Sequence, residues 1–170
     1  MKDKRGMIEM SFQMIFSLIL IAAFLYAAFV GIKYFMGTSD QVKINSFVSD
    51  LQSKVDQAYM TTEISETYSF SLPARIKSVC FADPTLAKSM LASECKDFEL
   101  YIPTFKSSGM NMFFCPALEA WKVGAPIYAK IQCKGKNCLS FPRVPYCIKN
   151  TGKFSIALEK NYGDSNIKLS

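Results

Sequence analysis

Hydrophobic and polar residues follow three successive patterns along this chain, and the first is a long apolar run. From Met14 to Ile32 nineteen consecutive residues carry no charge. As a helix, at about 1.5 Å per residue, they extend roughly 28 Å, close to the ~30 Å hydrocarbon core of a bilayer. Tyr34 and Phe35 follow, and aromatic rings suit a membrane interface. The pattern predicts a transmembrane helix over residues 14–36, because a helix satisfies its own backbone hydrogen bonds in lipid.

Two other structures are compatible with an apolar run near the N-terminus: a buried core helix and a cleaved secretory signal. A secretory apolar region has about 7–15 residues and ends at a small-x-small site. The run here is longer, and neither Ala22-Ala23 nor Ala27-Ala28 forms an Ala-x-Ala triplet. A retained anchor is therefore favoured over both alternatives.

Charges beside the apolar run predict its orientation. Lys2, Lys4 and Arg5 lie in residues 1–13, whereas Lys33 is the one basic residue directly on the other side. Because basic residues favour the cytoplasmic side, the N-terminus is expected on the inner side of the cytoplasmic membrane. The C-terminal part is expected outside, at the cell surface.

The second pattern predicts an amphipathic helix over residues 37–62. Residues 37–41 are expected to break the first helix and start a new one, since Thr38 and Gln41 have the Thr-x-x-Gln spacing of a capping box. Apolar residues then recur at steps of three and four, as in a helix with one buried face. They are Ile44, Phe47, Val48, Leu51, Val55, Ala58 and Tyr59. This stripe is expected to pack on the sheet of the same domain.

The third pattern, over residues 63–170, is mainly that of β-strands. Short apolar and alternating runs bounded by turn residues indicate a series of strands and one further helix. A helix is expected from Pro84 to Cys95, and Asn150-Thr151-Gly152 is expected to close a hairpin. The expected strands are residues 67–72, 76–81, 98–105, 112–115, 127–133, 145–149, 153–158 and 166–169, the two around the turn forming the hairpin. The predicted fold class is α+β, with a mostly antiparallel, β-rich domain outside the membrane.

Composition excludes several functions. The chain has no histidine, so catalytic triads and imidazole-bound zinc are impossible, and no phosphate-binding glycine loop is present. From Gly37 onward there are sixteen basic and twelve acidic residues, a surplus too small to indicate nucleic-acid binding. We expect no enzyme activity, no cofactor and no metal.

All six cysteines lie in the β-rich part: Cys80, Cys95, Cys115, Cys133, Cys138 and Cys147. An even number confined to the exported part indicates up to three disulfides in an oxidising compartment. Six cysteines allow 15 pairings, and Cys133 with Cys138, around a glycine-containing loop, is the favoured local pair. Free thiols remain an alternative, as does a metal site, although the spacing is unlike that of structural zinc sites.

Two groups of charged residues resemble binding or catalytic sites. The carboxylates of Glu94, Asp97 and Glu99 are close in sequence, but acid–base catalysis needs one of a pair buried, and an ordinary surface is favoured. A weak basic patch for anionic ligands is the other candidate, against a solvated surface. It comprises Lys130, Lys134, Lys136, Arg143, Lys149 and Lys153.

A basic tip (Lys4-Arg5-Gly6), then Met7-Ile8-Glu9, and a hydrophobic helix leading into an amphipathic one together resemble type IV pilin-like proteins, most closely the archaeal forms with class III signals. The resemblance covers roughly the first 60 residues. It implies cleavage after Gly6, Met7 as the mature N-terminus, subunits packed through the helix, and a β-rich head outside. The family's acidic residue usually stands at the fifth mature position, whereas Glu9 would be the third.

Glu9 next to an apolar helix is costly in lipid. It would be stabilised by a neighbouring subunit's α-amino group or by its own helix N-terminus; alternatively it stays among the headgroups.

Together these patterns predict a membrane-anchored structural or interaction protein, a pilin-like surface subunit. Its expected partners are the lipid bilayer and other membrane or surface subunits, including copies of itself. The alternative is a stand-alone protein with one membrane span whose outer domain binds a partner or scaffolds an envelope complex. An exported enzyme using carboxylate or lysine chemistry is less favoured.

Overall fold

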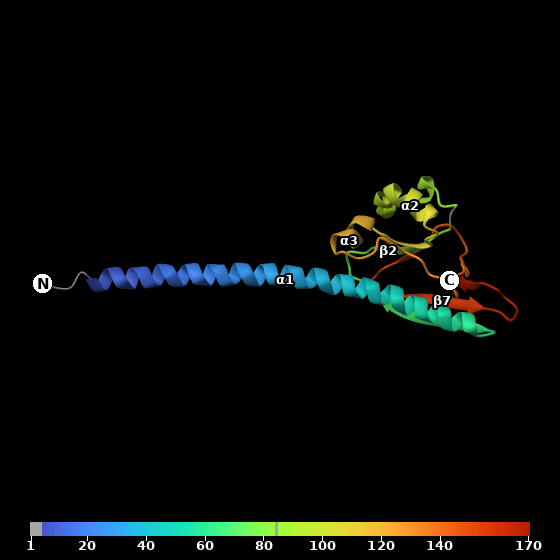
Figure 1. Cartoon of the computed structure of the whole chain (residues 1–170), viewed down its shortest axis with the longest axis horizontal. Coiled ribbons are helices and arrows are strands. Elements are labelled where there is room, and N and C mark those ends of the chain that lie inside the picture. Colours follow the sequence, from blue (N-terminus) through green and yellow to red (C-terminus); the bar gives the residue numbers. More distant parts are fainter. Residues whose placement is uncertain (1–4, 84) are drawn as a thin grey trace. The chain divides into compact units, whose positions relative to one another are not determined.

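The computed structural model describes residues 5–83 and 85–170, with side chains from residue 12 onward. The chain divides into two units, Met1–Ser39 and Asp40–Ser170, and its fold class is α+β, as predicted (Figure 1). The helices are α1 (Arg5–Met60), α2 (Ile102–Ser107) and α3 (Ala117–Lys122), with 3₁₀ helices η1 (Lys88–Met90) and η2 (Ser93–Tyr101). The strands are β1 (Ile64–Ser71), β2 (Ser78–Phe81), β3 (Met112–Cys115), β4 (Tyr128–Ala129), β5 (Leu139–Ser140), β6 (Tyr146–Lys149), β7 (Lys153–Lys160) and β8 (Ile167–Leu169).

Helix α1 continues through residues 37–41, so the predicted break at this point is wrong. Neither polar side chain caps a new helix. Thr38 Oγ1 donates to the carbonyl of Tyr34, one turn back in the same helix (3.1 Å), and Gln41 Nε2 donates to the carbonyl of Gly124 (3.0 Å). Because Thr38 bonds within the helix and Gln41 bonds to a loop, the capping-box spacing does not start a new helix here.

Two four-stranded sheets form the second unit. One has the order β1-β7-β8-β5 and the other β4-β3-β2-β6. All pairings are antiparallel except β5 with β8, which is parallel. The longest ladder joins β1 to β7 over eight residues, from Ile64 opposite Lys160 to Ser71 opposite Lys153.

The apolar stripe of α1 is buried, as the sequence predicts. Ile44, Leu51, Val55 and Ala58 are fully buried and Phe47 is 2% exposed, while Val48 and Tyr59 are partly buried against the same core. This core includes the inner faces of both sheets, with Phe154 and Ile156 from β7 and Phe114 from β3. The Phe47 ring lies 5.2 Å from that of Phe70 and 6.1 Å from that of Phe114. Phe47 therefore joins the helix to both sheets.

A second core lies on the other face of the β2–β3 pair, on the side where Figure 1 shows α2 and α3. Successive residues of a strand point to opposite faces, and β3 follows this rule. Phe114 belongs to the first core and Phe113 to the second. Phe113 stacks on Phe98 of η2, with ring centroids 4.1 Å apart. The central strands of this sheet are thus buried on both faces.

The strand predicted over residues 98–105 is wrong, because this segment forms η2 and α2. Phe98, Leu100 and Ile102 alternate in the sequence as in a strand, but Leu100 is 84% exposed. The buried residues are Phe98, Ile102 and Phe105, at steps of four and three, which is helical spacing. The helix predicted from residue 84 to 95 is two short 3₁₀ pieces, with Pro84 outside the described residues. Of the strand predicted over 127–133, only Tyr128–Ala129 is paired as β4.

The predicted hairpin around residues 150–152 is also wrong, although both of its strands exist. β6 pairs with β2, whereas β7 pairs with β1 and β8 in the other sheet. The reason lies in Asn150, whose Nδ2 donates to the carbonyls of Leu72, Pro73 and Ile76. These bonds fix the turn to the β1–β2 connection, and the strands on either side of it enter different sheets.

Candidate functional site

The most extensive unpartnered feature is the apolar surface of the first unit. In the described part of the chain, one helix is long and apolar enough to cross a membrane, and none of its most apolar window is buried. Large side chains from Phe12 to Met36 are exposed, including Phe24 (72%), Tyr26 (72%) and Phe35 (73%). Such a surface exceeds what soluble proteins leave in water, so it requires an apolar environment.

The residues for predicted processing and assembly lie at the start of this helix. Gly6, Met7 and Glu9 all fall within α1, while the side chains of Met7 and Glu9 lie outside the described ones. The basic residues Lys2 and Lys4 also lie outside the described residues.

The structure joins all six cysteines in three disulfides: Cys80–Cys147, Cys95–Cys115 and Cys133–Cys138. The last is the local pair expected from sequence. Cys80 and Cys147 lie directly opposite each other on β2 and β6. Together with the long apolar helix, the bridges suggest a membrane-anchored protein whose disulfide-bonded unit matures in an oxidising environment.

Two of these disulfides touch. Cys80 Sγ lies 3.9 Å from Cys95 Sγ and 3.9 Å from Cys115 Sγ. The sulfurs of Cys80, Cys95 and Cys147 all lie within 4.8 Å of one another, a grouping close enough to ligate a metal ion. Since each sulfur is in a disulfide, the thiolates that a metal needs are absent in this form. We call Cys80, Cys95, Cys115 and Cys147 the four-sulfur cluster.

The structure separates two parts of the predicted basic patch, Lys153 and the loop of Lys134 and Lys136. Lys153 starts β7 opposite Ser71. The loop of Lys134 and Lys136 lies beside β8, where Cys138 accepts a bond from Ile167, and β8 pairs with the far end of β7. Seven residue steps along β7, from Lys153 to Lys160, span roughly 23 Å at about 3.3 Å each. Lys153 therefore does not share a binding surface with Lys134 and Lys136.

The three carboxylates considered as a catalytic group have separate partners. Each accepts from a different donor: Glu94 from Ser78 Oγ (3.0 Å), Asp97 from the backbone N–H of Leu118 (2.8 Å), and Glu99 from Lys88 Nζ (2.6 Å). Asp97 Oδ1 is buried without a hydrogen-bond partner among the described residues. Because the three do not converge, they do not form the paired arrangement that acid–base catalysis needs.

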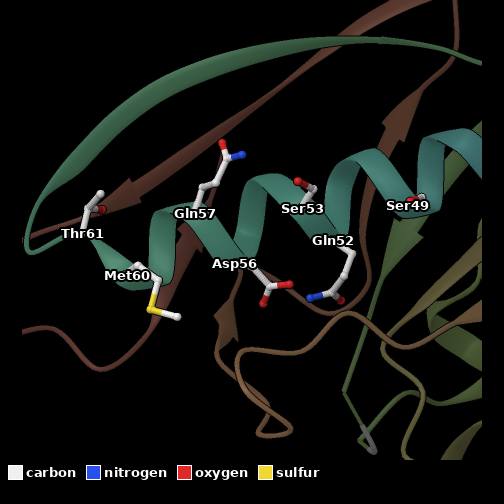
Figure 2. A pocket seen from close by; sticks show the side chains of 7 residues that line it. All are labelled: Ser49, Gln52, Ser53, Asp56, Gln57, Met60 and Thr61. Atoms are coloured by element: carbon white, nitrogen blue, oxygen red, sulfur yellow. The ribbon is translucent and has the colours of Figure 1, made fainter.

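Several surface hollows of the second unit lie along α1, and another lies beside β5, lined by Asp83 and by residues from Asn137 to Val144. The one in Figure 2 is lined by seven residues from the last turns of α1 and the residue after it: Ser49, Gln52, Ser53, Asp56, Gln57, Met60 and Thr61. Figure 2 shows Gln57 pointing away from Asp56 and Gln52, so the polar groups do not aim at a common point. Gln52 is also occupied, because its amide bonds both the carbonyl (2.6 Å) and the N–H (3.0 Å) of Gln132. The hollow thus lacks the convergent polar groups of a ligand pocket.

Lys160 donates hydrogen bonds to carbonyl groups at the C-terminal end of α1, a role that the sequence does not indicate. Its side chain is 9% exposed, and Nζ donates to the carbonyls of Tyr59 (2.9 Å) and Thr61 (2.7 Å). The last turn of α1 has no basic residue of its own. Lys160 therefore supplies the positive charge that a helix C-terminus favours. No sequence motif indicates this contact, because about a hundred residues separate its partners.

Replacing Lys160 with methionine is expected to lower the free energy of unfolding by about 1.5–3 kcal/mol, the range for hydrogen bonds to charged groups. The measurement is urea unfolding of the full-length protein in detergent. Lys168→Met is the matched control, since Lys168 is exposed on β8. Equal midpoints for the two variants would contradict the role given to Lys160.

Tyr68 provides a pH-dependent contact on the outer strand β1. Its hydroxyl donates to Glu66 Oε2. This hydrogen bond, then burial, then the charge of Glu66 raise the pKa of Tyr68 from 10.0 to about 12.

We expect Glu66→Gln to return the pKa of Tyr68 toward 10.0. The folded chain holds this proton more tightly than the unfolded chain. The contribution to stability is therefore complete below pH 10 and is lost as pH rises toward 12. The ultraviolet titration of tyrosinate, taken as the difference from a Tyr68→Phe variant, measures the pKa. Glu63→Gln, at an exposed neighbouring position, is the control and should leave the titration unchanged.

Comparison with known proteins adds no relative: the chain matches no protein-family model, no curated protein and no solved structure.

Proposed function

We propose that this protein is a pilin-like surface subunit with a structural or interaction role, anchored in the cytoplasmic membrane by the first part of α1. The N-terminus is inside and the disulfide-bonded unit is at the cell surface. The observation that carries the proposal is the exposure of the apolar side chains from Phe12 to Met36.

The energetic argument concerns what covers these side chains. Removing one large apolar side chain from water contributes about 1.5–3 kcal/mol, and more than a dozen are exposed in this segment. A bilayer covers all of them at once. Neighbouring helices of other subunits, which the pilin-like resemblance implies, would cover one side. Lipid and copies of the same chain are therefore the proposed partners.

Disulfides and flanking charges support the orientation. Three bridges lie in the second unit, which fits folding outside the reducing cytoplasm. The basic residues Lys2, Lys4 and Arg5 favour an inside N-terminus.

The second unit supports a non-catalytic role. Its helix segment from Ile44 to Ala58 is built into the core, and its carboxylates bind separate neighbours. Such a unit offers surfaces for contact with other proteins. The resemblance to pilins, at the basic tip and the helix, suggests subunits of the same kind.

The intact mass of the protein from native membranes, before and after reduction, tests the proposal. We expect loss of residues 1–6, with Met7 as the new N-terminus, and a gain of two hydrogen atoms for each of the three bridges. An uncut chain would exclude a processed pilin and favour the stand-alone anchored protein that binds a partner. Six free thiols before reduction would contradict the outward orientation.

A further inference from the structure

We propose that the four-sulfur cluster is a thiol–disulfide exchange site, at which an external thiol entering at Cys147 converts the pairs Cys80–Cys147 and Cys95–Cys115 into Cys80–Cys115 and Cys95–Cys147. The reagent class is a small thiol or the exposed thiol of an oxidoreductase. This inference does not depend on the proposed function.

Access singles out Cys147. Cys80 and Cys115 are fully buried and Cys95 is 1% exposed, whereas Cys147 is half-buried on β6. β6 is an edge strand, paired with β2 alone among the described strands. Cys147 is therefore the one residue of the cluster that is not buried, and we assign the entry of the external thiolate to it.

Distances then define the sequence of steps. The external thiolate attacks Cys147 Sγ, forming a mixed disulfide, and Cys80 leaves as a thiolate. Cys80 Sγ lies 3.9 Å from both Cys95 Sγ and Cys115 Sγ. It attacks Cys115, so that Cys95 leaves as a thiolate. Cys95 Sγ, within 4.8 Å of Cys147 Sγ, attacks the mixed disulfide and releases the external thiolate. One bond forms and one breaks at each step, so the thiol is regenerated and no oxidant is consumed.

The sheet keeps the sulfurs in place when a bridge opens. β2 pairs with β3 on one side and β6 on the other, so Cys80 stays in the centre of a ladder after its disulfide breaks. Burial disfavours a free thiolate at Cys80, and the nearest alternative for that sulfur is the adjacent disulfide. The third bridge, Cys133–Cys138, belongs to the other core and cannot participate.

Exchange would change which elements are fastened together. In the structure, one bridge joins β2 to β6 and the other joins η2 to β3. After exchange, β2 is joined to β3 and η2 to the edge strand β6. The number of cross-links is the same. The edge strand β6, however, is then bridged to η2 and no longer to the central strand β2.

The test exposes the folded, full-length protein in detergent to substoichiometric glutathione, followed by acid quenching and mass spectrometry of the linked peptides. We expect parallel loss of the two native pairs, appearance of Cys80–Cys115 and Cys95–Cys147, and no loss of Cys133–Cys138. Glutathione accumulating on Cys147 while Cys95–Cys115 stays whole would overturn the proposal.

A pair of variants tests the internal step alone. Cys147→Ser leaves Cys80 as a free thiol beside Cys95–Cys115, and we expect pairs of Cys80 with Cys95 and Cys115 to form at the expense of the native bridge. Cys138→Ser is the matched control, because it leaves a buried thiol at Cys133 in the other core and should leave Cys95–Cys115 intact. A Cys147→Ser protein with its Cys95–Cys115 bridge intact and Cys80 fully free would refute the exchange step.

Discussion

Replacing Phe47 with alanine is expected to lower the free energy of unfolding by about 3–5 kcal/mol, the usual cost of removing a buried phenylalanine. Phe47 is 2% exposed, and its ring lies 5.2 Å from that of Phe70, 5.6 Å from that of Phe154 and 6.1 Å from that of Phe114. The three rings come from both sheets, so neighbouring side chains cannot fill the cavity left by Phe47 without losing contacts elsewhere. Full-length protein in detergent, with its disulfides intact and unfolded in urea, gives the measurement.

Val42→Ala is the matched control for Phe47→Ala. Val42 lies five residues earlier in the same helix and is 57% exposed, and surface substitutions usually change stability by less than about 0.5 kcal/mol. A loss of similar size in the two variants would contradict the packing of this face of α1 on the sheets.

Replacing Ala23 with arginine is expected to release a large fraction of the protein from the membrane. Ala23 is the middle residue of the nineteen-residue uncharged run from Met14 to Ile32. An arginine at the centre of a spanning helix costs about 2.5–3.5 kcal/mol during insertion. The measurement is the fraction that stays in the membrane pellet after an alkaline wash. Absence of the three disulfides from protein that fails to insert and stays in the cytoplasm would report the same defect.

Two variants control for the effect of Ala23→Arg. Ala23→Leu keeps the run apolar and should be retained like the unaltered protein. Thr38→Arg adds the same charge to α1 beyond the apolar run and should also be retained. Release of all three variants, or of none, would contradict the proposed anchor.

The elements that the sequence predicts correctly are those whose signal is local. The steps of three and four from Ile44 to Ala58 reveal the buried face of α1, because a helix brings these residues onto one side. The strands β1, β3 and β8 likewise follow from alternation or from apolar runs between turn residues. In contrast, the segment Phe98–Phe105 is compatible with both a strand and a helix, because its apolar residues fit alternation as well as helical spacing. The stacking of Phe98 on Phe113 favours the helical conformation.

Among the cysteine pairs, too, local sequence indicates some features and only the fold reveals others. The cysteine count predicted disulfides, and the short loop between Cys133 and Cys138 indicated one pair. The other two pairs depend on β2 lying between β3 and β6, a register that no local spacing encodes. The contact of Cys80 with Cys95 and Cys115 follows from that register and was not foreseen.

Local sequence is enough to define the apolar segment, the buried stripe of α1 and the number of cysteines available for bridges. Each depends on residues within a few turns of helix or on composition alone. Three features emerge only in the folded chain: β6 and β7 enter different sheets, Lys160 bonds the carbonyls at the end of α1, and two disulfides are in contact. The physical reason is that these contacts join residues far apart in the chain, where strand register and side-chain packing, rather than local conformational preference, select the partner.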